Sequence, residues 1–206
     1  MDMRQAEYIR KSRETEIKAD LNIDGKGETK IKTKIPFLDH MLELFAFHGF
    51  FDLSLGVLKN DEAIDLHHTN EDVGIVLGKV FNKALGEKKG IKRFGVGFAP
   101  MESCLGRTVV DISGRGYLSI NIAGKDISSV EIKAEENYSL TYLEHFMESF
   151  AHGLAATINI YIDNPSADLH TNVEAVFKSL GLALDQATQI DPRRPDEVPS
   201  TKGIID

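Results

Sequence analysis

The alternation of apolar and polar positions along the chain predicts a regular series of strands and helices. Residues 16–23 (EIKADLNI) and 28–35 (ETKIKTKI) alternate in the way that is typical of strands, with a glycine-containing turn between them. Residues 36–49 (PFLDHMLELFAFHG) have helical spacing, a proline near the start and a glycine at the end. A strand at 50–58 and an amphipathic helix at 71–86 complete a first unit.

The second half of the chain shows the same order of elements. Residues 107–114 and 117–122 are rich in residues that favour strands, and residues 138–153 have the spacing of a helix. A strand at 155–162 and an amphipathic helix at 173–187 follow. Two such strand-strand-helix-strand-helix units predict an α+β protein whose helices cover one face of a sheet.

The similarity between the halves extends to the residues themselves. Segment 38–46 (LDHMLELFA) matches segment 143–151 (LEHFMESFA), and segment 65–78 (DLHHTNEDVGIVLG) matches segment 168–181 (DLHTNVEAVFKSLG). The offsets are 105 (143 minus 38) and 103 (168 minus 65), so the chain is interpreted as an internal duplication. The expected division is a first half at 1–90, a second half at 91–190 and a C-terminal tail at 191–206.

Composition narrows the class of protein without naming a function. The chain has 206 residues and a net charge of −8, which argues against nucleic acid as a partner because phosphate backbones require a basic surface. Cys104 is the only cysteine, so an intramolecular disulfide is excluded. No apolar run is long enough for a membrane span, and residues 1–16 do not have the pattern of a secretory signal. We therefore expect a cytoplasmic protein with no membrane partner.

The repeated DLH segments carry the strongest chemical signal. On a helix that begins near Asp65, His67 and Glu71 stand at i and i+4, and His68 and Glu71 at i and i+3, so these side chains can meet on one face. His170 and Glu174 repeat the i, i+4 pair. Imidazole and carboxylate are common ligands of manganese, iron and zinc, and adjacent histidines point in different directions and can serve two metals.

Two further histidines occupy equivalent positions in the repeat. His40 precedes the first DLH segment and His145 precedes the second, so each half is expected to build one copy of a metal site. A lone histidine on an apolar helix is more often a hydrogen-bonded core residue. Here five of the seven histidines fall inside the repeated motifs, which favours metal binding for the set.

Basic and hydroxyl residues along this acidic chain suggest a local anion site. Arg115 lies in a Gly-Arg-Gly turn, and the segment 200–203 (STKG) offers hydroxyls, an ammonium group and flexible backbone. Spacing alone leaves this hypothesis open, and it leaves Glu14 as a charged surface residue. The candidate donors are Arg93, Arg107, Arg115, Lys178, Ser200 and Lys202.

Seven segments in order along the chain resemble one known family. They are PFLDHML (36–42), DLHHTNED (65–72), RFGVGFAPM (93–101), VVDISGRGYL (109–118), EHFMES (144–149), EAVFK (174–178) and PSTKG (199–203). In combination these segments resemble imidazoleglycerol-phosphate dehydratase of histidine biosynthesis. The resemblance implies a lyase that removes water from imidazole glycerol phosphate to give imidazole acetol phosphate through a manganese-bound imidazolate.

The resemblance also implies an architecture and an assembly. The fold would be two pseudo-symmetric halves of the ribosomal protein S5 domain 2-like type, each a four-stranded sheet carrying two helices. The subunits would form trimers that assemble into a 24-subunit particle, with two Mn²⁺ ions per site at subunit interfaces. The partners would be a small phosphorylated imidazole substrate and further copies of the chain.

Roles for individual residues follow from the same resemblance. The metal ligands would be His40, His67, His68, Glu71, His145, His170 and Glu174. The substrate phosphate would be bound by Arg93, Arg115, Lys178, Ser200 and Lys202, with the C-terminal tail contributing to that site. The catalytic carboxylates would be Glu14, Glu71 and Glu174, with Glu14 supplied to the site as an acid or base.

The chain departs from the family pattern in its second half. Thr171 stands where the family has a second histidine, and Ile158-Asn159 replaces a usual Leu-His. Threonine is a poor ligand for a divalent ion, so one metal is expected to have fewer protein ligands. Two alternatives to the dehydratase remain: a divergent metal-dependent hydrolase or isomerase, and a non-catalytic paralogue that metal merely assembles.

Overall fold

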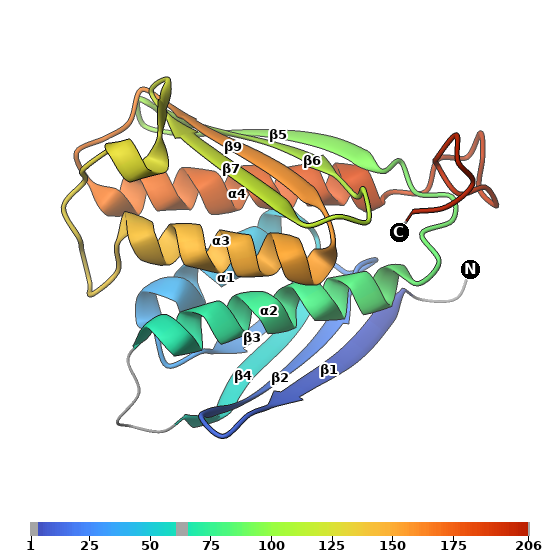
Figure 1. Cartoon of the computed structure of the whole chain (residues 1–206), viewed down its shortest axis with the longest axis horizontal. Coiled ribbons are helices and arrows are strands. Elements are labelled where there is room, and N and C mark those ends of the chain that lie inside the picture. Colours follow the sequence, from blue (N-terminus) through green and yellow to red (C-terminus); the bar gives the residue numbers. More distant parts are fainter. Residues whose placement is uncertain (1–3, 61–65, 206) are drawn as a thin grey trace.

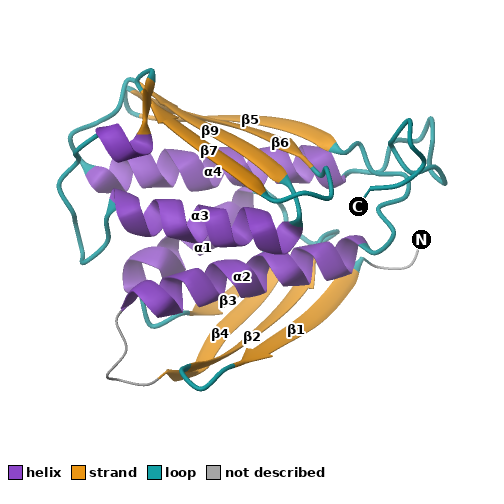
Figure 2. Cartoon of the chain, viewed as in Figure 1, coloured by secondary structure: helices purple, strands orange, loops and turns teal. Residues whose placement is uncertain are grey.

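The computed structural model, which describes residues 4–60 and 66–205, has its helices in the middle and a sheet on either side. Figures 1 and 2 show the two sheets as outer layers, with the four helices α1 to α4 between them. Within these residues, no helix combines the length and the apolar character needed to cross a membrane. The expected α+β class is confirmed.

The first half forms the lower sheet of Figure 1 and its two helices. Its elements are β1 (Gln5–Lys11), β2 (Thr15–Asn22), β3 (Thr29–Lys32), α1 (Pro36–His48), β4 (Asp52–Asn60) and α2 (Leu66–Leu85). The strand order is β1-β2-β4-β3, and β3 runs parallel to β4, so α1 is the crossover between them. Alternate residues of β2, Ile17, Ala19 and Leu21, are buried beneath the helices.

The second half repeats this topology. Its elements are β5 (Phe94–Met101), β6 (Cys104–Asp111), β7 (Tyr117–Ile122), β8 (Lys125–Asp126), the 3-10 helix η1 (Ile127–Ser129), α3 (Leu140–Leu154), β9 (Thr157–Asp163) and α4 (Leu169–Thr188). The order β5-β6-β9-β7-β8 matches the first sheet, and β7 and β9 form the equivalent parallel pair. The two-residue β8 is an addition that makes this sheet five-stranded rather than four-stranded.

Each half begins with a strand that the apolar pattern does not reveal. β1 is an edge strand whose inward Ala6 and Tyr8 are only half-buried against the core while Ile9 is exposed, so its apolar pattern is weak. β5 reverses the usual pattern: its phenylalanines are exposed, whereas Gly95 and Gly97 face α4. A Cβ at these glycines would meet the backbone of Ala183 and Ser179, so close packing requires glycine there.

The helices pack in pairs that cross between the halves. α2 packs against α3, and α1 packs against α4. Gly78 of α2 lies against the carbonyl of Phe150, and the equivalent Gly181 of α4 lies against the carbonyl of Phe45. The rings of Phe45 and Phe150, which the repeat makes equivalent, meet at 6.2 Å between their centroids. This arrangement brings side chains of the two halves together at the helix interfaces.

Candidate metal centres

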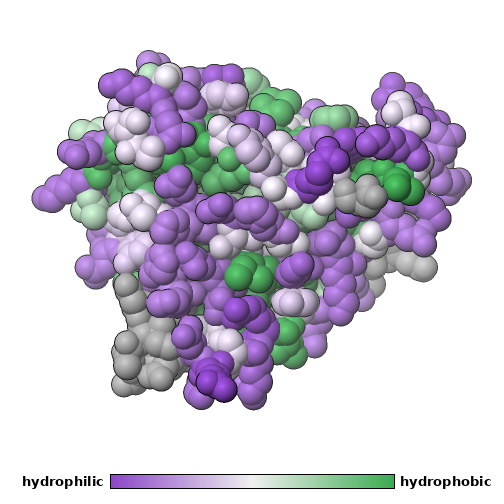
Figure 3. Space-filling model, in the orientation of Figure 1, coloured by the Kyte–Doolittle hydropathy of each residue, from purple (hydrophilic) through white to green (hydrophobic). Residues whose placement is uncertain are grey.

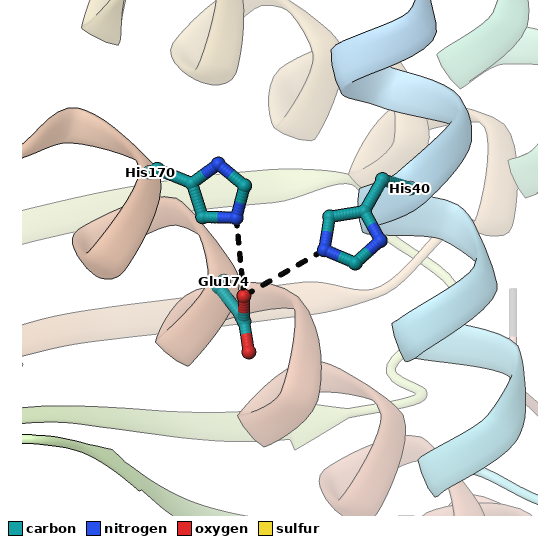
Figure 4. Close-up of side chains that lie close together, drawn as sticks. All are labelled: His40, His170 and Glu174. Atoms are coloured by element: carbon teal, nitrogen blue, oxygen red, sulfur yellow. Dashed lines mark ion pairs between the residues drawn. The ribbon is translucent and has the colours of Figure 1, made fainter.

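The first triad consists of His40 on α1 with His170 and Glu174 on α4. Nε2 of His170 lies 3.2 Å and Nε2 of His40 lies 3.7 Å from the same carboxylate oxygen, Oε2 of Glu174. Figure 4 shows both rings pointing at that oxygen from different helices. The three ligand atoms lie within 4.8 Å of one another, which is close enough for one ion.

The second triad consists of His67 and Glu71 on α2 with His145 on α3. Oε1 of Glu71 lies 3.0 Å from Nε2 of His67 and 3.4 Å from Nδ1 of His145. The two Nδ1 atoms of His67 and His145 are 3.2 Å apart. These ligand atoms also lie within 4.8 Å of one another, so the structure contains two groups of the same composition.

Each triad takes residues from both halves of the chain. We expected each half to build its own site, with His40 beside the first DLH segment and His145 beside the second. In the structure His40 instead joins His170 and Glu174, whereas His145 joins His67 and Glu71. The reason is the helix packing, because α1 lies against α4 and α3 lies against α2.

The predicted i, i+4 geometry of the DLH segments is confirmed. The His67–Glu71 and His170–Glu174 pairs each close within one helical turn. Asp168 caps α4 by accepting the backbone N–H of Thr171 at 2.9 Å. The equivalent Asp65 lies outside the described residues, and α2 is described from Leu66.

His68 and its equivalent, Thr171, are not interchangeable. His68 is exposed, and its ring meets that of His67 edge-on at 5.4 Å between centroids. Among the described residues it belongs to neither triad. Thr171 is buried, and its hydroxyl donates to the carboxylate of Asp168. Hydrogen bonds from Thr171 lower the pKa of Asp168 to about 2, so this cap stays ionised.

Sequence reasoning did not identify the aromatic residues behind the first triad. The ring of Phe37 meets His170 edge-on at 5.5 Å and stacks on Tyr138 at 4.7 Å. The buried Tyr138 hydroxyl donates to Asn70 of α2, whose side-chain amide donates to the carbonyl of Tyr142. These contacts connect the aromatic residues beside His170 of the first triad to α2, the helix that carries His67 and Glu71 of the second triad. No spacing rule reveals them, because they join residues distant in sequence.

Lys178 connects the first triad to the predicted phosphate-binding residues. Its ammonium group contacts Oε1 of Glu174, while the two imidazoles face Oε2. Burial tends to raise the pKa of Glu174, but the hydrogen bond and charge of Lys178 outweigh it and hold that pKa below its ordinary value. The carboxylate is therefore ionised and suited to bind a cation.

The other predicted phosphate-binding residues lie at the far end of α4. Arg93 donates to Asp111 at 2.6 and 3.1 Å and to the carbonyl of Pro199 at 3.0 Å, which joins it to the C-terminal tail. Its backbone N–H donates to Ala187. Since Lys178 lies nine residues before Ala187 on α4, the two ends are roughly 14 Å apart along the helix. One chain alone does not gather the whole set.

Three of the remaining predicted residues, Arg115, Lys202 and Glu14, are exposed, whereas Ser200 is half-buried. Ser200 accepts the backbone N–H of Lys202 at 3.2 Å. Glu14 is exposed in the turn between β1 and β2. Within the described residues, Glu14 forms no ion pair with either triad.

A hollow of about 390 Å³ adjoins the second triad. Glu71 and His145 line it together with Lys79, Ser149 and His152, none of which sequence reasoning proposed for binding. A larger hollow of about 670 Å³ lies on the outer face of the first sheet. Neither triad lines that larger hollow, so the chemistry points to the smaller one.

Comparison with known proteins identifies the family. The model of the imidazoleglycerol-phosphate dehydratase (IGPD) family matches residues 33–184, which include both triads and Lys178. The chain belongs to this family. The imidazoleglycerol-phosphate dehydratase of Thermoanaerobacter sp. (strain X514) is 48% identical over 205 residues, covering 98% of this chain and 100% of the relative. That of Bacillus subtilis (strain 168) is 44% identical over 204 residues, with coverage of 98% and 100%.

Solved structures of the dehydratase family share the fold. The structure of IGPD from Pyrococcus furiosus in complex with (S)-C348 superposes with a TM-score of 0.77 at 35% identity, covering 96% of this chain and 99% of that one. The enzyme from Staphylococcus aureus subsp. aureus N315 gives a TM-score of 0.73 at 31% identity, covering 90% and 99%. The duplicated architecture is therefore that of the dehydratase family.

Proposed function

We propose that this chain dehydrates imidazoleglycerol phosphate in histidine biosynthesis at a double metal centre formed by the two triads. Family membership carries the reaction, because the chain and its relatives match over nearly their whole lengths. The observation that supports a metal-dependent mechanism is the pair of His-His-Glu groups, each with its ligand atoms within 4.8 Å.

The residues of both triads fit a divalent transition metal. Each triad offers two imidazole nitrogens and one carboxylate oxygen, the donor types that such ions bind. Glu174 is buried and ionised, and although Lys178 pairs with Oε1, its Oε2 faces the two imidazoles and is placed to bind a cation. We propose manganese as this metal, with His40, His170 and Glu174 holding one ion and His67, Glu71 and His145 the other.

We propose that the exposed His68 binds a metal ion that is held by another copy of the chain. It follows His67 on α2, and consecutive helical positions point about 100° apart, so its ring cannot join the triad of His67. As a ligand it must therefore act on an ion held by another copy of the chain. This is the reason to place the double centre at a subunit interface.

The dehydration removes hydroxide from the carbon attached to the imidazole ring and a proton from the next carbon, which leaves an enol that becomes the keto group of imidazole acetol phosphate. When bound, the metal would act as a Lewis acid that stabilises the deprotonated ring, whose electron density assists the loss of hydroxide. Glu71 and Glu174 hold the cations, and Glu14 is proposed to transfer the proton. Because Glu14 is exposed in the β1–β2 turn, its carboxylate is open to substrate bound at a neighbouring subunit.

Phosphate binding in this proposal divides between two ends of α4. Lys178 lies at the first triad, whereas Arg93 lies at the other end beside the tail, which carries Ser200 and Lys202. Arg115 follows Ile112 by three residues, and the backbone N–H of Ile112 donates to the carbonyl of Arg93. We assign the set to one phosphate site built by neighbouring copies. The division into halves 1–90 and 91–190 and a tail 191–206 remains part of this proposal, in which the tail approaches the phosphate site through the contact of Pro199 with Arg93.

Self-association has support from the outer surface of the second sheet. Phe94, Val96 and Phe98 lie along the edge strand β5 with exposed fractions of 57%, 44% and 54%. Figure 3 shows apolar side chains reaching the surface over this sheet. A row of exposed apolar side chains is typical of a protein interface. We propose assembly of trimers into a 24-subunit particle, and a cytoplasmic location in keeping with the buried free thiol of Cys104.

The test is direct. Purified protein loaded with Mn²⁺ is expected to convert imidazoleglycerol phosphate to imidazole acetol phosphate, and removal of the metal with a chelator is expected to abolish the conversion. If the manganese-loaded protein forms no product, the proposal is wrong. If a chelator changes neither the rate nor the particle mass, the metal-dependent mechanism is wrong even though the dehydratase assignment stands.

A further inference from the structure

We propose that the two metal centres of this chain have unequal affinities, and that the weaker one is the second triad. This rests on the proposed function, in that both triads hold divalent ions. The substitution that weakens the second triad is Thr171, although Thr171 adjoins His170 of the first triad in sequence. Thr171 affects the second triad because, in the assembly, Thr171 of one copy lies beside the second triad of a neighbouring copy.

The internal repeat relates the two triads to each other. His40 is equivalent to His145, His170 to His67, and Glu174 to Glu71. The first triad and the second triad are therefore equivalent to each other in the internal repeat. His68 and Thr171 are equivalent positions of the same repeat. Whatever position His68 takes beside one triad of a neighbouring copy, Thr171 takes the equivalent position beside the other triad.

Lys178 decides which triad receives His68. Among the described residues, the first triad alone has a lysine paired with its carboxylate, and the position equivalent to Lys178 is Ile75. His68 lies beside the second triad of its own chain. If it also contacted the second triad of another copy, that double centre would consist of two second triads and would contain no Lys178. If His68 meets the first triad, every double centre contains one triad of each kind and one lysine for the substrate phosphate. We therefore assign His68 to the first triad of a neighbour and Thr171 to the second.

The two centres then differ by one ligand. The first triad gains the imidazole of His68 and offers three nitrogens and a carboxylate. The second triad faces Thr171, whose buried hydroxyl already donates to Asp168 and is a poor metal ligand, so its ion would have one protein ligand fewer. Loss of an outer-shell partner alone costs about 10- to 100-fold in metal affinity, and loss of a direct ligand is expected to cost at least as much.

The difference in burial between the two carboxylates also favours weaker metal affinity at the second triad. The side chain of Glu174 is 9% exposed, whereas that of Glu71 is 34% exposed. Within a single chain, the carboxylate of the second triad is therefore the more accessible to competing water. Lys178 acts against this order, because its ammonium neutralises part of the charge of Glu174, but it contacts Oε1 and leaves Oε2 facing the imidazoles as a ligand.

The experiment is a manganese titration of the metal-free protein, with bound metal counted per chain by equilibrium dialysis, free Mn²⁺ followed by electron paramagnetic resonance and particle mass followed by light scattering. We expect two steps of one ion per chain, separated by at least about tenfold in dissociation constant. His145→Asn is expected to remove the weaker step and keep the tighter one. His68→Asn is expected to weaken the tighter step, although His68 adjoins the second triad in sequence.

His152→Asn is the matched control, because His152 lines the hollow beside the second triad but belongs to neither triad, and both steps should persist. Thr171→His, provided its circular dichroism is unchanged, should tighten the weaker step at least about tenfold. Two equal steps in the unaltered protein would overturn the inequality and leave the proposed function intact. Weakening of only the later step by His68→Asn would overturn the crossed assignment. Absence of saturable Mn²⁺ binding would instead overturn the proposed function.

Discussion

Nδ1 of His145 lies 3.4 Å from Oε1 of Glu71, although the two residues belong to different halves of the chain. In the equivalent contact, a histidine of the first half, His40, faces a glutamate of the second half, Glu174. Neither half therefore contains a complete metal centre. The positions of the ligands depend on how closely α2 packs on α3 and α1 on α4, which makes the helix interfaces part of the site.

Gly78→Ala and Gly181→Ala form a matched pair that tests this dependence. A Cβ at Gly78 would lie 2.5 Å from the carbonyl oxygen of Phe150, and one at Gly181 would lie 2.5 Å from that of Phe45. Such overpacking typically costs about 1–3 kcal/mol of folding free energy. We expect Gly78→Ala to weaken manganese binding at the second triad and Gly181→Ala at the first, as measured by denaturant unfolding and metal titration. Gly56→Ala, where a Cβ meets nothing within 4 Å, is the control.

Glu174→Gln is expected to lower manganese affinity at the first triad by at least about tenfold and to lower kcat/KM with it. The reason is that Oε2 of Glu174 is shared by His40 and His170, so the amide removes the charge that both imidazoles surround. Metal analysis after dialysis and steady-state kinetics provide the measurement. Glu43→Gln changes an exposed glutamate elsewhere on α1 and should leave metal content unchanged. Unchanged metal content in Glu174→Gln would contradict its assignment as a ligand.

Lys178→Met is expected to raise KM for the phosphorylated substrate. A hydrogen bond to a charged group contributes about 1.5–3 kcal/mol, which corresponds to a rise of about tenfold or more. Steady-state kinetics should show this rise with a smaller change in kcat, and inhibition by inorganic phosphate should weaken in parallel. A fall in kcat alone, with phosphate inhibition unchanged, would assign Lys178 to Glu174 rather than to the substrate.

Tyr138→Phe is expected to destabilise the fold by about 1–3 kcal/mol, because it leaves the side-chain oxygen of buried Asn70 without its donor. The ring stacked on Phe37 is preserved, so the effect measures the hydrogen bond. Chemical denaturation of the metal-free protein gives the value. Tyr117→Phe, which alters an exposed tyrosine of β7, is the comparison, and an equal or larger loss there would contradict this reasoning.

Asp52→Asn tests the acid dependence of stability away from the metal centres. Burial tends to raise the pKa of Asp52, but hydrogen bonds from the backbone N–H groups of Lys26 (2.7 Å) and Glu28 (3.0 Å) outweigh it and lower that pKa. The folded-state pKa is thus below the unfolded value. Its stabilisation is present above the unfolded pKa, near 4, and is lost as pH falls through the folded value. The substitution should therefore reduce stability at pH 7 and flatten its decline in acid, as measured by unfolding at several pH values.

The sequence by itself determined the duplication, the α+β class and the spacing of the ligands within each helix. These features are local or repeated: the i, i+4 pairs His67–Glu71 and His170–Glu174 follow from helical geometry once the helix is recognised. Apolar alternation likewise revealed β2, whose inward side chains are apolar. It could not reveal β5, because glycines rather than large apolar residues face α4.

Only the tertiary structure decided which histidine joins which pair. The sequence spacing placed His40 beside the first DLH segment, whereas packing of α1 on α4 places it beside His170 and Glu174. Pairings between helices depend on close approaches such as that of Gly181 to Phe45, which no one-dimensional period encodes. The same packing leaves His68 outside both triads and commits Thr171 to the cap of α4, which makes the two repeated segments chemically unequal.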